Sequence, residues 1–380
     1  MQMRRSFLVL TLAVIILFIL ASPASSTAVA AGLWYVAPEG IDSNNCASPT
    51  TPCASIKAAI GKAKDGDTIR IAVGTYTDPS ENFVVHIDKN LDLTGGWDSS
   101  FTVQRGLSTI DGQHIHAGLL VDYYATATIT RMKIMNGYTP FVGELGAGIS
   151  SFGNLTINES QISNNTAGSQ TSNVSGGGIH NRNQTMIINK SSISDNRLEG
   201  PWVKNGGIEN YGPLYINNST ISGNMGDALY SGSNVSLNNV TISDNEGAGI
   251  ISQDGVVSIR NSIVFGNDTA HAGHSDCELI AGYSGSVESR GFNLFGTLNG
   301  CAFAGTDRIG TDPRMLPLVG EPGFHPLQPS SPAINTGNPG GCLDGSDHPI
   351  VVDQRGIPRD SLCDVGAYEV TAVFLPYLRR

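Results

Sequence analysis

The chain has 380 residues, enough for one large buried core or two ordinary domains. Its formal net charge is −11, its sequence pI is about 5.1, and no basic stripe runs along it. These features argue against nucleic acid as a partner.

The first 31 residues have the pattern of a secretory signal peptide. Arg4 and Arg5 precede an apolar run, Phe7–Leu20, and small residues follow as far as Ala31. An uncleaved membrane anchor is the alternative, but these 14 apolar residues fall short of the ~20 that a spanning helix needs. We therefore expect an exported mature chain, extracellular or at the cell surface, without a transmembrane segment.

Six cysteines fit an oxidising compartment. Fifteen pairings are possible, and we expect each cysteine to pair with its neighbour in the sequence. No spacing of Cys and His indicates a structural zinc site instead. The expected disulfides are Cys46–Cys53, Cys277–Cys301 and Cys342–Cys363.

Residues 32–66 are predicted to form an N-terminal cap. Within them, Ala54–Lys64 is predicted to be a helix with one apolar face, which can cover the open end of a stack of strands. The next stretches, Asp65–Thr77 and Phe83–Gly96, are predicted to be the first coils of that stack. The apolar face of the helix consists of Ile56, Ala59, Ile60 and Ala63.

An eleven-residue pattern then recurs. LTINESQISNN (Leu155–Asn165) returns in four further copies that end at Asn196, Asn224, Asn245 and Asn267, in steps of 31, 28, 21 and 22 residues. A basal period of 21–22 residues is typical of a solenoid. Each copy has two apolar residues five positions apart, which face one interior only if a corner separates two strands. These pairs are Ile157/Ile162, Ile188/Ile193, Ile216/Ile221, Leu237/Ile242 and Ile259/Val264, and Ala127–Gly137 is a degenerate earlier copy.

We therefore predict an all-β fold, a right-handed single-stranded parallel β-helix over residues 67–310, with the N-terminal capping helix. A 21-residue coil leaves no room for a crossover helix, and parallel crossovers favour the right hand. The final Asn of each copy is expected at a bend, in a left-handed backbone conformation, with its amide hydrogen-bonded along the stack. Most Asn-X-Ser/Thr triplets fall in these turns, so we interpret them as structural rather than as glycosylation sites.

Three successive loops follow the same turn: Tyr138–Leu145, Thr166–Ser175 and Arg197–Asn205. Insertions gathered on one face of a solenoid often mark its binding face. Aromatic and hydrogen-bonding side chains suit sugar rings, although the aromatic residues could instead fold back over their own loops. The predicted ligand-binding residues are Tyr138, Phe141, Arg197, Trp202 and Lys204.

Other groups of reactive residues are sparse on the coils. Asp195 and Asp244 lie about 10 Å apart at ~4.8 Å per coil, too far to share a calcium ion. Glu159 and Lys190 face each other and are interpreted as a surface ion pair rather than a catalytic dyad. Two histidine groups lack a third ligand, and we interpret them as solvated residues rather than metal sites. They are His114 and His116 near Asp111, and His271 and His274 with Asp276.

Residues 311–370 are predicted to form a separate C-terminal segment, followed by a tail at 371–380. The segment contains a charged set that could be catalytic, but we interpret it as an ion-pair network that fastens the segment to the solenoid. The set consists of Asp353, Arg355, Arg359, Asp364 and Glu369.

Four stretches resemble exported bacterial proteins with a pectate-lyase-like β-helix. Trp34–Thr77, beginning WYVAPEG, and Leu93–Gly112 resemble the opening and next coils of that family, while SPAINTGNP (Ser331–Pro339) and DQRGIPRDSLCDVGAYE (Asp353–Glu369) look like its choice-of-anchor Q domain. The resemblance implies a secreted or surface-displayed protein. It also implies an anchor, but the tail is too short to span a membrane and LPYLR is not an LPxTG sorting signal, so the mode of attachment stays open.

Two functions follow. We favour a non-catalytic display, adhesion or glycan-binding module that acts as a monomer without a cofactor. The alternative is a polysaccharide lyase, for which the resemblance implies calcium, or a glycosidase. For the glycosidase, Glu144 and Glu199 are the acid and base candidates, since such a pair needs carboxyl groups about 5–9.5 Å apart.

Overall fold

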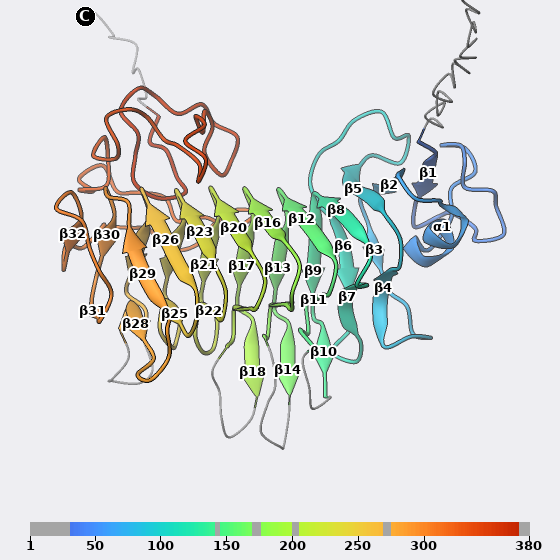
Figure 1. The fold of residues 1–380 in the computed structure, drawn as a ribbon. Coiled ribbons are helices and arrows are strands. Elements are labelled where there is room, and N and C mark those ends of the chain that lie inside the picture. The colour runs from blue at the N-terminus through green and yellow to red at the C-terminus, as the bar shows by residue number, and fades with distance from the viewer. Residues whose placement is uncertain (1–30, 141–144, 169–175, 200–204, 269–274, 372–380) are drawn as a thin grey trace, which may run out of the picture. The chain divides into compact units, whose positions relative to one another are not determined.

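The computed structural model describes residues 31–140, 145–168, 176–199, 205–268 and 275–371. Short strands stack in parallel, each coil on the one before, as Figure 1 shows. Each full coil passes through three long sheets in a fixed order, which we call sheet C, sheet A and sheet B. This arrangement is a right-handed parallel β-helix, as the sequence predicts.

The strands of the three sheets are as follows. Sheet A contains β1 (Leu33–Val36), β2 (Asp67–Ala72), β5 (Leu91–Trp97), β8 (Thr126–Thr130), β12 (Asn154–Asn158), β16 (Met186–Asn189), β20 (Leu214–Asn217), β23 (Val235–Asn238), β26 (Val256–Arg260) and β29 (Ser286–Ser289). Sheet B contains β3 (Thr75–Tyr76), β6 (Ser108–Asp111), β9 (Met132–Met135), β13 (Gln161–Ser163), β17 (Ser192–Ser194), β21 (Thr220–Ser222), β24 (Thr241–Ser243), β27 (Ile263–Phe265), β30 (Leu294–Phe295) and β32 (Arg308–Ile309). Sheet C contains β4 (Phe83–Ile87), β7 (Ala117–Val121), β11 (Ile149–Ser151), β15 (Ile179–Asn181), β19 (Ile208–Asn210), β22 (Leu229–Ser231), β25 (Ile250–Ser252), β28 (Cys277–Leu279) and β31 (Leu298–Asn299).

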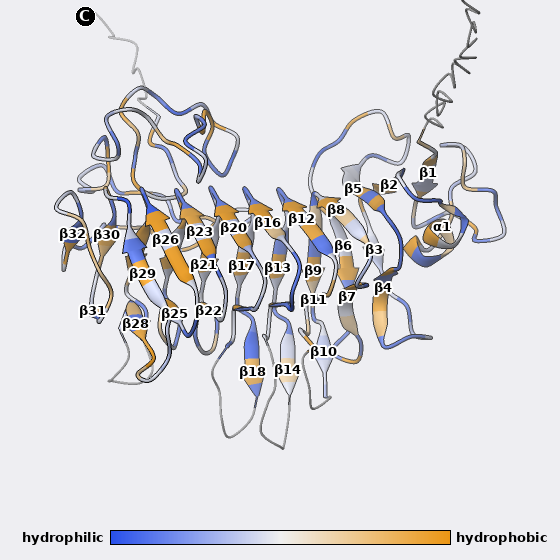
Figure 2. Ribbon diagram, in the orientation of Figure 1, coloured by the Kyte–Doolittle hydropathy of each residue, from blue (hydrophilic) through white to orange (hydrophobic). Residues whose placement is uncertain are grey.

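The predicted register of the repeats is confirmed. Ile157 pairs with Ile188, and the same column continues through Ile216, Leu237 and Ile259. All five side chains are fully buried, and the second column, from Ile162 to Val264, runs parallel to it on sheet B. Figure 2 shows the hydrophobic residues concentrated on the sheet A strands of these coils. Each buried aliphatic side chain contributes about 1.5–3 kcal/mol, so these columns hold the stack together.

A continuous ladder of asparagine side chains lines the bend that follows sheet B. Each Nδ2 donates to the Oδ1 of the next rung, at 2.7–3.0 Å from Asn165 through Asn196, Asn224 and Asn245 to Asn267. Each Nδ2 also donates to a main-chain carbonyl, for example from Asn224 to Ile193 at 3.0 Å. The predicted amide stacking is therefore confirmed.

The predicted left-handed conformation lies one residue earlier than expected. The positive φ angles belong to the residues just before the rungs: Asn164, Asp195, Gly223, Asp244 and Gly266. The rung side chain must point inward to meet its neighbours, and the residue before it makes the bend. At the coil before the ladder, Gly137 takes the place of Asn because an added Cβ would lie 2.1 Å from the Ala147 carbonyl oxygen.

The N-terminal cap is built as the sequence indicates. Helix α1 (Ile56–Lys62) begins after Ser55, whose side chain accepts a hydrogen bond from the main-chain N of Ala58. Its apolar face packs into the main core. The buried residues of this face are Ile56, Ala59, Ile60 and Ala63. Asp67 ties the cap to the first coil by accepting hydrogen bonds from the Trp34 indole at 2.8 Å and from the main-chain N of Gly32 and Lys64.

The C-terminal segment, described as far as residue 371, folds back along the β-helix. Among its described residues, only isolated bridges replace regular strands. Gln354 accepts a hydrogen bond from Thr220 at 2.6 Å, and His325 meets the Ser222 hydroxyl at 2.8 Å, so the segment covers the outer side of sheet B. The three predicted disulfides, Cys46–Cys53, Cys277–Cys301 and Cys342–Cys363, are all present.

Candidate functional site

The coils with insertions carry a small outgrowth of their own. Strands β10 (Tyr138–Thr139), β14 (Thr166–Gly168) and β18 (Arg197–Glu199) pair in parallel and project from the edge of the β-helix between sheets B and C, as Figure 1 shows. Ala147, Ala167 and Leu198 form a separate buried cluster beneath them. The predicted extension of three consecutive coils along one edge is confirmed for the described residues.

The predicted ligand-binding residues are placed only in part. Tyr138 is half-buried, and its ring lies along the outgrowth, over Gly168 of the next coil. A Cβ added at Gly168 would lie 3.2 Å from the Tyr138 hydroxyl. Arg197 and Glu199 are exposed and form an ion pair at 3.2 Å. Phe141, Glu144, Trp202 and Lys204 lie outside the described residues. The pairing of Glu144 with Glu199 as acid and base therefore stays a prediction.

Next to the outgrowth, the outer face of sheet C carries a buried polar cluster. The Nδ1 atom of His180 lies 3.1 Å from Oε2 of Glu209, whose Oε1 accepts hydrogen bonds from Asn205 at 3.1 Å and from the Tyr211 hydroxyl at 3.0 Å. His180 is fully buried, and Nε2 of its ring has no hydrogen-bond partner among the described residues. The cluster fixes a carboxylate, an imidazole and a phenol side by side on neighbouring coils.

Burial raises the pKa of two tyrosines of this face. It raises the pKa of Tyr211 well above its usual range, and the adjacent Glu209 carboxylate raises that pKa further. Burial likewise raises the pKa of Tyr230 to about 12. Tyr230 donates its hydroxyl hydrogen to Gln253. Both phenols therefore remain hydrogen-bond donors at any physiological pH.

A row of aromatic rings follows the corner between sheets C and A. We call Tyr123, Phe152 and Tyr211 the aromatic row. Tyr123 and Phe152 are on adjacent coils with ring centroids 4.9 Å apart, and the Arg182 guanidinium of the next coil lies 5.8 Å from the centroid of Phe152. Tyr211 continues the line one coil further and is 39% exposed. Its ring centroid lies 6.3 Å from that of Tyr230 behind it.

Glycine makes room for the last ring of this row. Gly232 occupies the position of Tyr211 on the following coil, and a Cβ added there would lie 2.8 Å from the Tyr211 ring. The ring can therefore lie across the next coil only because the side chain there is absent. A substitution at Gly232 would move Tyr211 without touching any other member of the aromatic row.

The sequence contained a signal for this row that the repeat analysis passed over. Phe152, Arg182 and Tyr211 each directly follow a sheet C strand. They stand three or four residues before the first apolar residue of their copies, Leu155, Met186 and Leu214. Aligning the copies on their start rather than on their final Asn would have placed these side chains in one line.

The carboxylates of the two histidine groups, Asp276 and Asp111, have hydrogen-bond partners within the protein. Asp276 accepts hydrogen bonds from the main-chain N and side-chain Nδ2 of Asn267 and so forms the last rung of the asparagine ladder, while His271 and His274 lie outside the described residues. Asp111 accepts hydrogen bonds from the main-chain N of Gln113 and from the side chain of Asn136. His114 is exposed and His116 is half-buried, and no group of three metal-ligating side chains occurs among the described residues.

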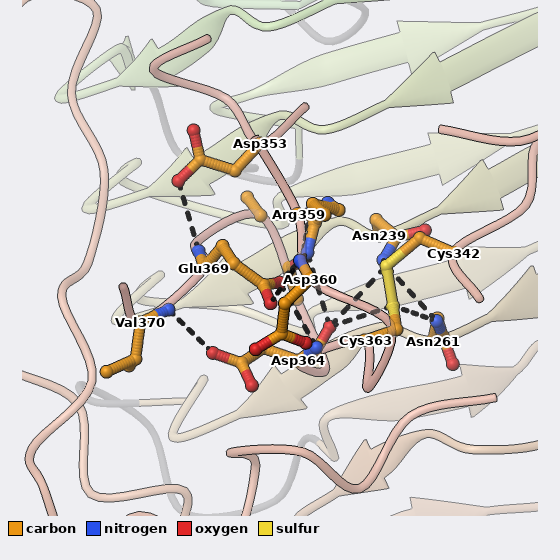
Figure 3. A network of polar contacts seen from close by, with 12 residues as sticks. Asn239, Asn261, Cys342, Asp353, Arg359, Asp360, Cys363, Asp364, Glu369 and Val370 are labelled. Carbon is orange, nitrogen blue, oxygen red and sulfur yellow. Dashed lines mark hydrogen bonds and ion pairs between the residues drawn. A yellow bond between two sulfur atoms is a disulfide. The ribbon is translucent and has the colours of Figure 1, made fainter. Parts of the chain in front are cut away.

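The charged set of the C-terminal segment forms the fastening network that the sequence predicts, and Figure 3 shows four of its members, Asp353, Arg359, Asp364 and Glu369. Arg359 pairs with Glu369 at 2.9 Å, donates to Asn218 of the β-helix at 2.7 Å and is almost fully buried. Arg355 pairs with Asp353 at 2.6 Å. Asp364 accepts from the main-chain N of Asn335 and Val370. Both cations and the three carboxylates have partners within the protein.

Comparisons with known proteins agree with this architecture. A family model described as the right handed beta helix region matches residues 117–295. The crystal structure of pectate lyase Pel9A is similar over 89% of this chain and 96% of that chain, with a TM-score of 0.50 and 16% sequence identity. The chain has a pectate lyase-like fold. No curated protein matches the sequence. No helix among the described residues is long and apolar enough to cross a membrane.

Proposed function

We propose that the chain is a secreted or surface-displayed carbohydrate-binding protein, and that the outer face of sheet C holds the sugar chain between the outgrowth and the aromatic row. The aromatic row carries this proposal. Tyr123 and Phe152 stand on adjacent coils and Tyr211 stands two coils beyond Phe152, at ~4.8 Å per coil. The three rings present apolar surface beside hydrogen-bond donors. Sugar rings offer the complementary combination of one apolar face and a rim of hydroxyl groups.

Several further features support an exported, displayed protein. Three disulfides suit an oxidising compartment. The signal peptide expected in residues 1–31 and the choice-of-anchor Q-like segment expected at 311–370 remain part of the same proposal. Attachment through the tail at 371–380, and action as a monomer, belong to it too.

Degradation of a polysaccharide is the second candidate, and the cluster around His180 favours it. A buried imidazole beside a carboxylate is an arrangement that can move a proton. The pectate lyase-like fold also supports this reading, although fold alone does not assign a reaction. Within the described residues, Glu199 is an exposed carboxylate paired with Arg197, which suits neither role of a glycosidase pair well.

The test is a panel of polysaccharides offered to the full mature chain, with and without calcium. We expect retention of at least one glycan in affinity electrophoresis, without new reducing ends and without ultraviolet-absorbing unsaturated products. Tyr211→Ala should weaken that binding about fivefold, because one stacking ring is worth about 1 kcal/mol. Tyr215→Ala is the matched control, since Tyr215 is a similarly exposed tyrosine on sheet A.

Product formation would overturn the non-catalytic proposal, and loss of that product in His180→Ala would then establish the second candidate. Equal effects of Tyr211→Ala and Tyr215→Ala would remove the aromatic row from the site. Failure to bind any glycan of a broad panel would overturn carbohydrate binding altogether.

A further inference from the structure

The downstream coils of the β-helix are strongly acidic. Between Lys204 and Arg290 the sequence has nine carboxylates, and Arg260 is its single lysine or arginine. Arg260 stands at the end of β26 on sheet A and pairs with Asp347 of the C-terminal segment at 2.7 Å. The carboxylates belong to Glu209, Asp227, Asp244, Glu246, Asp254, Asp268, Asp276, Glu278 and Glu288.

Most of these carboxylates belong to sheet C and to the turns beside it. Glu209 and Glu278 lie on its strands β19 and β28, and Asp254 directly follows β25. The turns that lead into its strands contribute four more: Asp227, Glu246, Asp268 and Asp276. Because Arg260 stands on sheet A, no lysine or arginine between residues 205 and 289 accompanies them on sheet C.

A tyrosine on this face reports the sign of the local potential. Tyr230 in β22 pairs in register with Glu209 of the coil before it and with Ile251 of the coil after it. The pKa of Tyr230 is raised to about 12, first by burial and then by neighbouring acidic groups: Glu209, Tyr283, Asp254 and Asp227. Negative charge around a phenol opposes its ionisation, so the raised pKa agrees with an acidic surface here.

Exposed rings and a carboxylate follow one another along the corner between sheets C and A. The Tyr211 ring lies over Gly232 of the following coil, and Asp254 stands at the same corner one coil further on. At ~4.8 Å per coil, a half-buried carboxylate therefore lies close to an exposed ring. Asp254 accepts a hydrogen bond from the Ser284 hydroxyl at 2.8 Å, and Tyr283, the residue before Ser284, is exposed.

The described basic groups on this side of the upstream coils do not offset this charge at the surface. The Arg182 guanidinium lies 5.8 Å from the ring centroid of Phe152, on the coil before its own. Arg197 of the outgrowth pairs with Glu199 at 3.2 Å, and His180 is fully buried. The aromatic row therefore has a basic upstream end and an acidic downstream end.

We propose that the downstream end of the sheet C face binds a cationic sugar chain, a polymer of amino sugars, with an ammonium group between the Tyr211 ring and Asp254. This inference rests on the proposed function and narrows it to one class of substrate. An ammonium group over an aromatic ring and near a carboxylate is attracted by both. The same carboxylates repel an acidic polysaccharide. A lysine-rich peptide offers ammonium groups too, but the exposed rings suit the flat faces of sugar units better.

The test compares three sugar hexamers by isothermal titration calorimetry on the full mature chain, at a pH below the pKa of the sugar amine. The chitosan hexamer carries an ammonium group on each unit, its N-acetylated form is neutral, and the galacturonate hexamer is acidic. We expect the chitosan hexamer to bind about fivefold more tightly than the acetylated form, because an exposed ion pair contributes up to about 1 kcal/mol. The galacturonate hexamer should bind most weakly, and added salt should reduce the preference for chitosan.

Asp254→Asn removes one charge and keeps the oxygen that accepts from Ser284. It should weaken binding of the chitosan hexamer about threefold and leave binding of the acetylated hexamer unchanged. Asp92→Asn is the matched control, since Asp92 is an exposed carboxylate on sheet A, and it should change neither affinity. Tyr211→Ala should weaken the binding of both hexamers, because the ring contacts the sugar whatever its charge.

The outcomes separate this inference from the proposed function. Tighter binding of the galacturonate hexamer, equal binding of the chitosan and acetylated hexamers, or an unchanged affinity in Asp254→Asn would overturn the choice of amino sugars and leave carbohydrate binding standing. If hexalysine binds as tightly as the chitosan hexamer and Tyr211→Ala affects neither, the surface is an acidic patch only, and the inference is wrong. If none of the three hexamers binds, the inference also fails, and the broader polysaccharide panel then decides the proposed function by itself.

Discussion

The asparagine ladder makes a quantitative prediction through its central rung. Oδ1 of Asn224 accepts from the main-chain N and from Nδ2 of Asn196, both at 3.0 Å. Its Nδ2 donates to the Ile193 carbonyl at 3.0 Å and to Oδ1 of Asn245 at 2.9 Å. Asn224→Ala removes all four bonds from a fully buried site, and at about 1 kcal/mol each the free energy of unfolding should fall by about 4 kcal/mol.

Asn217→Ala is the matched control on the same coil. Asn217 also belongs to a row of stacked amides, with bonds of 3.0 Å to Asn189 and Asn238, but this row lies on the half-exposed outer side of sheet A. Water can replace those bonds, so the control should lose less than about 1 kcal/mol. Both variants would be unfolded in urea and followed by circular dichroism.

Because coils of a solenoid can unfold separately, a local measurement should accompany the global one. The main-chain amide of Asn196 donates to Asn224, so its hydrogen exchange should accelerate in Asn224→Ala and stay unchanged in Asn217→Ala. If the two variants lose the same stability, the ladder contributes no more than surface amides do, and the reasoning is refuted.

Three further predictions concern the core, the cap and the C-terminal segment. Ile216→Asp should place an unpaired charge in the main aliphatic column and cost several kcal/mol, and an unchanged melting temperature would show that this column does not hold the stack together. Burial opposes ionisation of Asp67, but the three hydrogen bonds that its carboxylate accepts outweigh burial and lower its pKa. The carboxylate therefore stabilises the fold at pH values above its usual pKa, and this stabilisation is lost as the pH falls through the lowered pKa. Tryptophan fluorescence should report this loss through Trp34, and Asp67→Asn should abolish the transition; a transition that persists there would rule Asp67 out. Arg359→Met leaves the buried Glu369 without its cation and should lower the free energy of unfolding by about 3–5 kcal/mol. Limited proteolysis should then release the C-terminal segment faster than in the wild type. An unchanged cleavage rate would mean that this ion pair does not fasten the segment.

The sequence predicts the β-helix well because its own periodicity carries the information. Inward residues five positions apart require a corner, and the recurring Asn fixes which residues stack, so the columns through Ile157 and Ile162 follow directly. The backbone conformation of the bend was misplaced by one residue, because a pattern of side chains does not reveal which residue turns the chain. At Gly223 and Gly266 the glycine just before the rung was the available signal.

The candidate sites were harder to predict for a different reason. The aromatic row was hidden because insertions of different length separate Phe152 from Tyr211 and break the regular spacing. The contacts between the C-terminal segment and the coils join distant residues, such as Lys133 and Glu321, which lie 188 residues apart in the chain. No period links those positions, so only the folded chain brings them together.

The last rung of the asparagine ladder determines where further rungs can be added by duplication of a coil. The side-chain amide of every Asn rung accepts a hydrogen bond from the coil before it and donates one to the coil after it. A duplicated copy of residues 225–245 would therefore find compatible hydrogen-bond partners between any two rungs. Asp276 differs, because a carboxylate accepts hydrogen bonds on both oxygens, here from Asn267 and Thr297, and has nothing to donate to a following coil. The ladder can therefore be lengthened by duplication upstream of residue 276, whereas the coils beyond it, with β29 to β32, stack without an Asn rung.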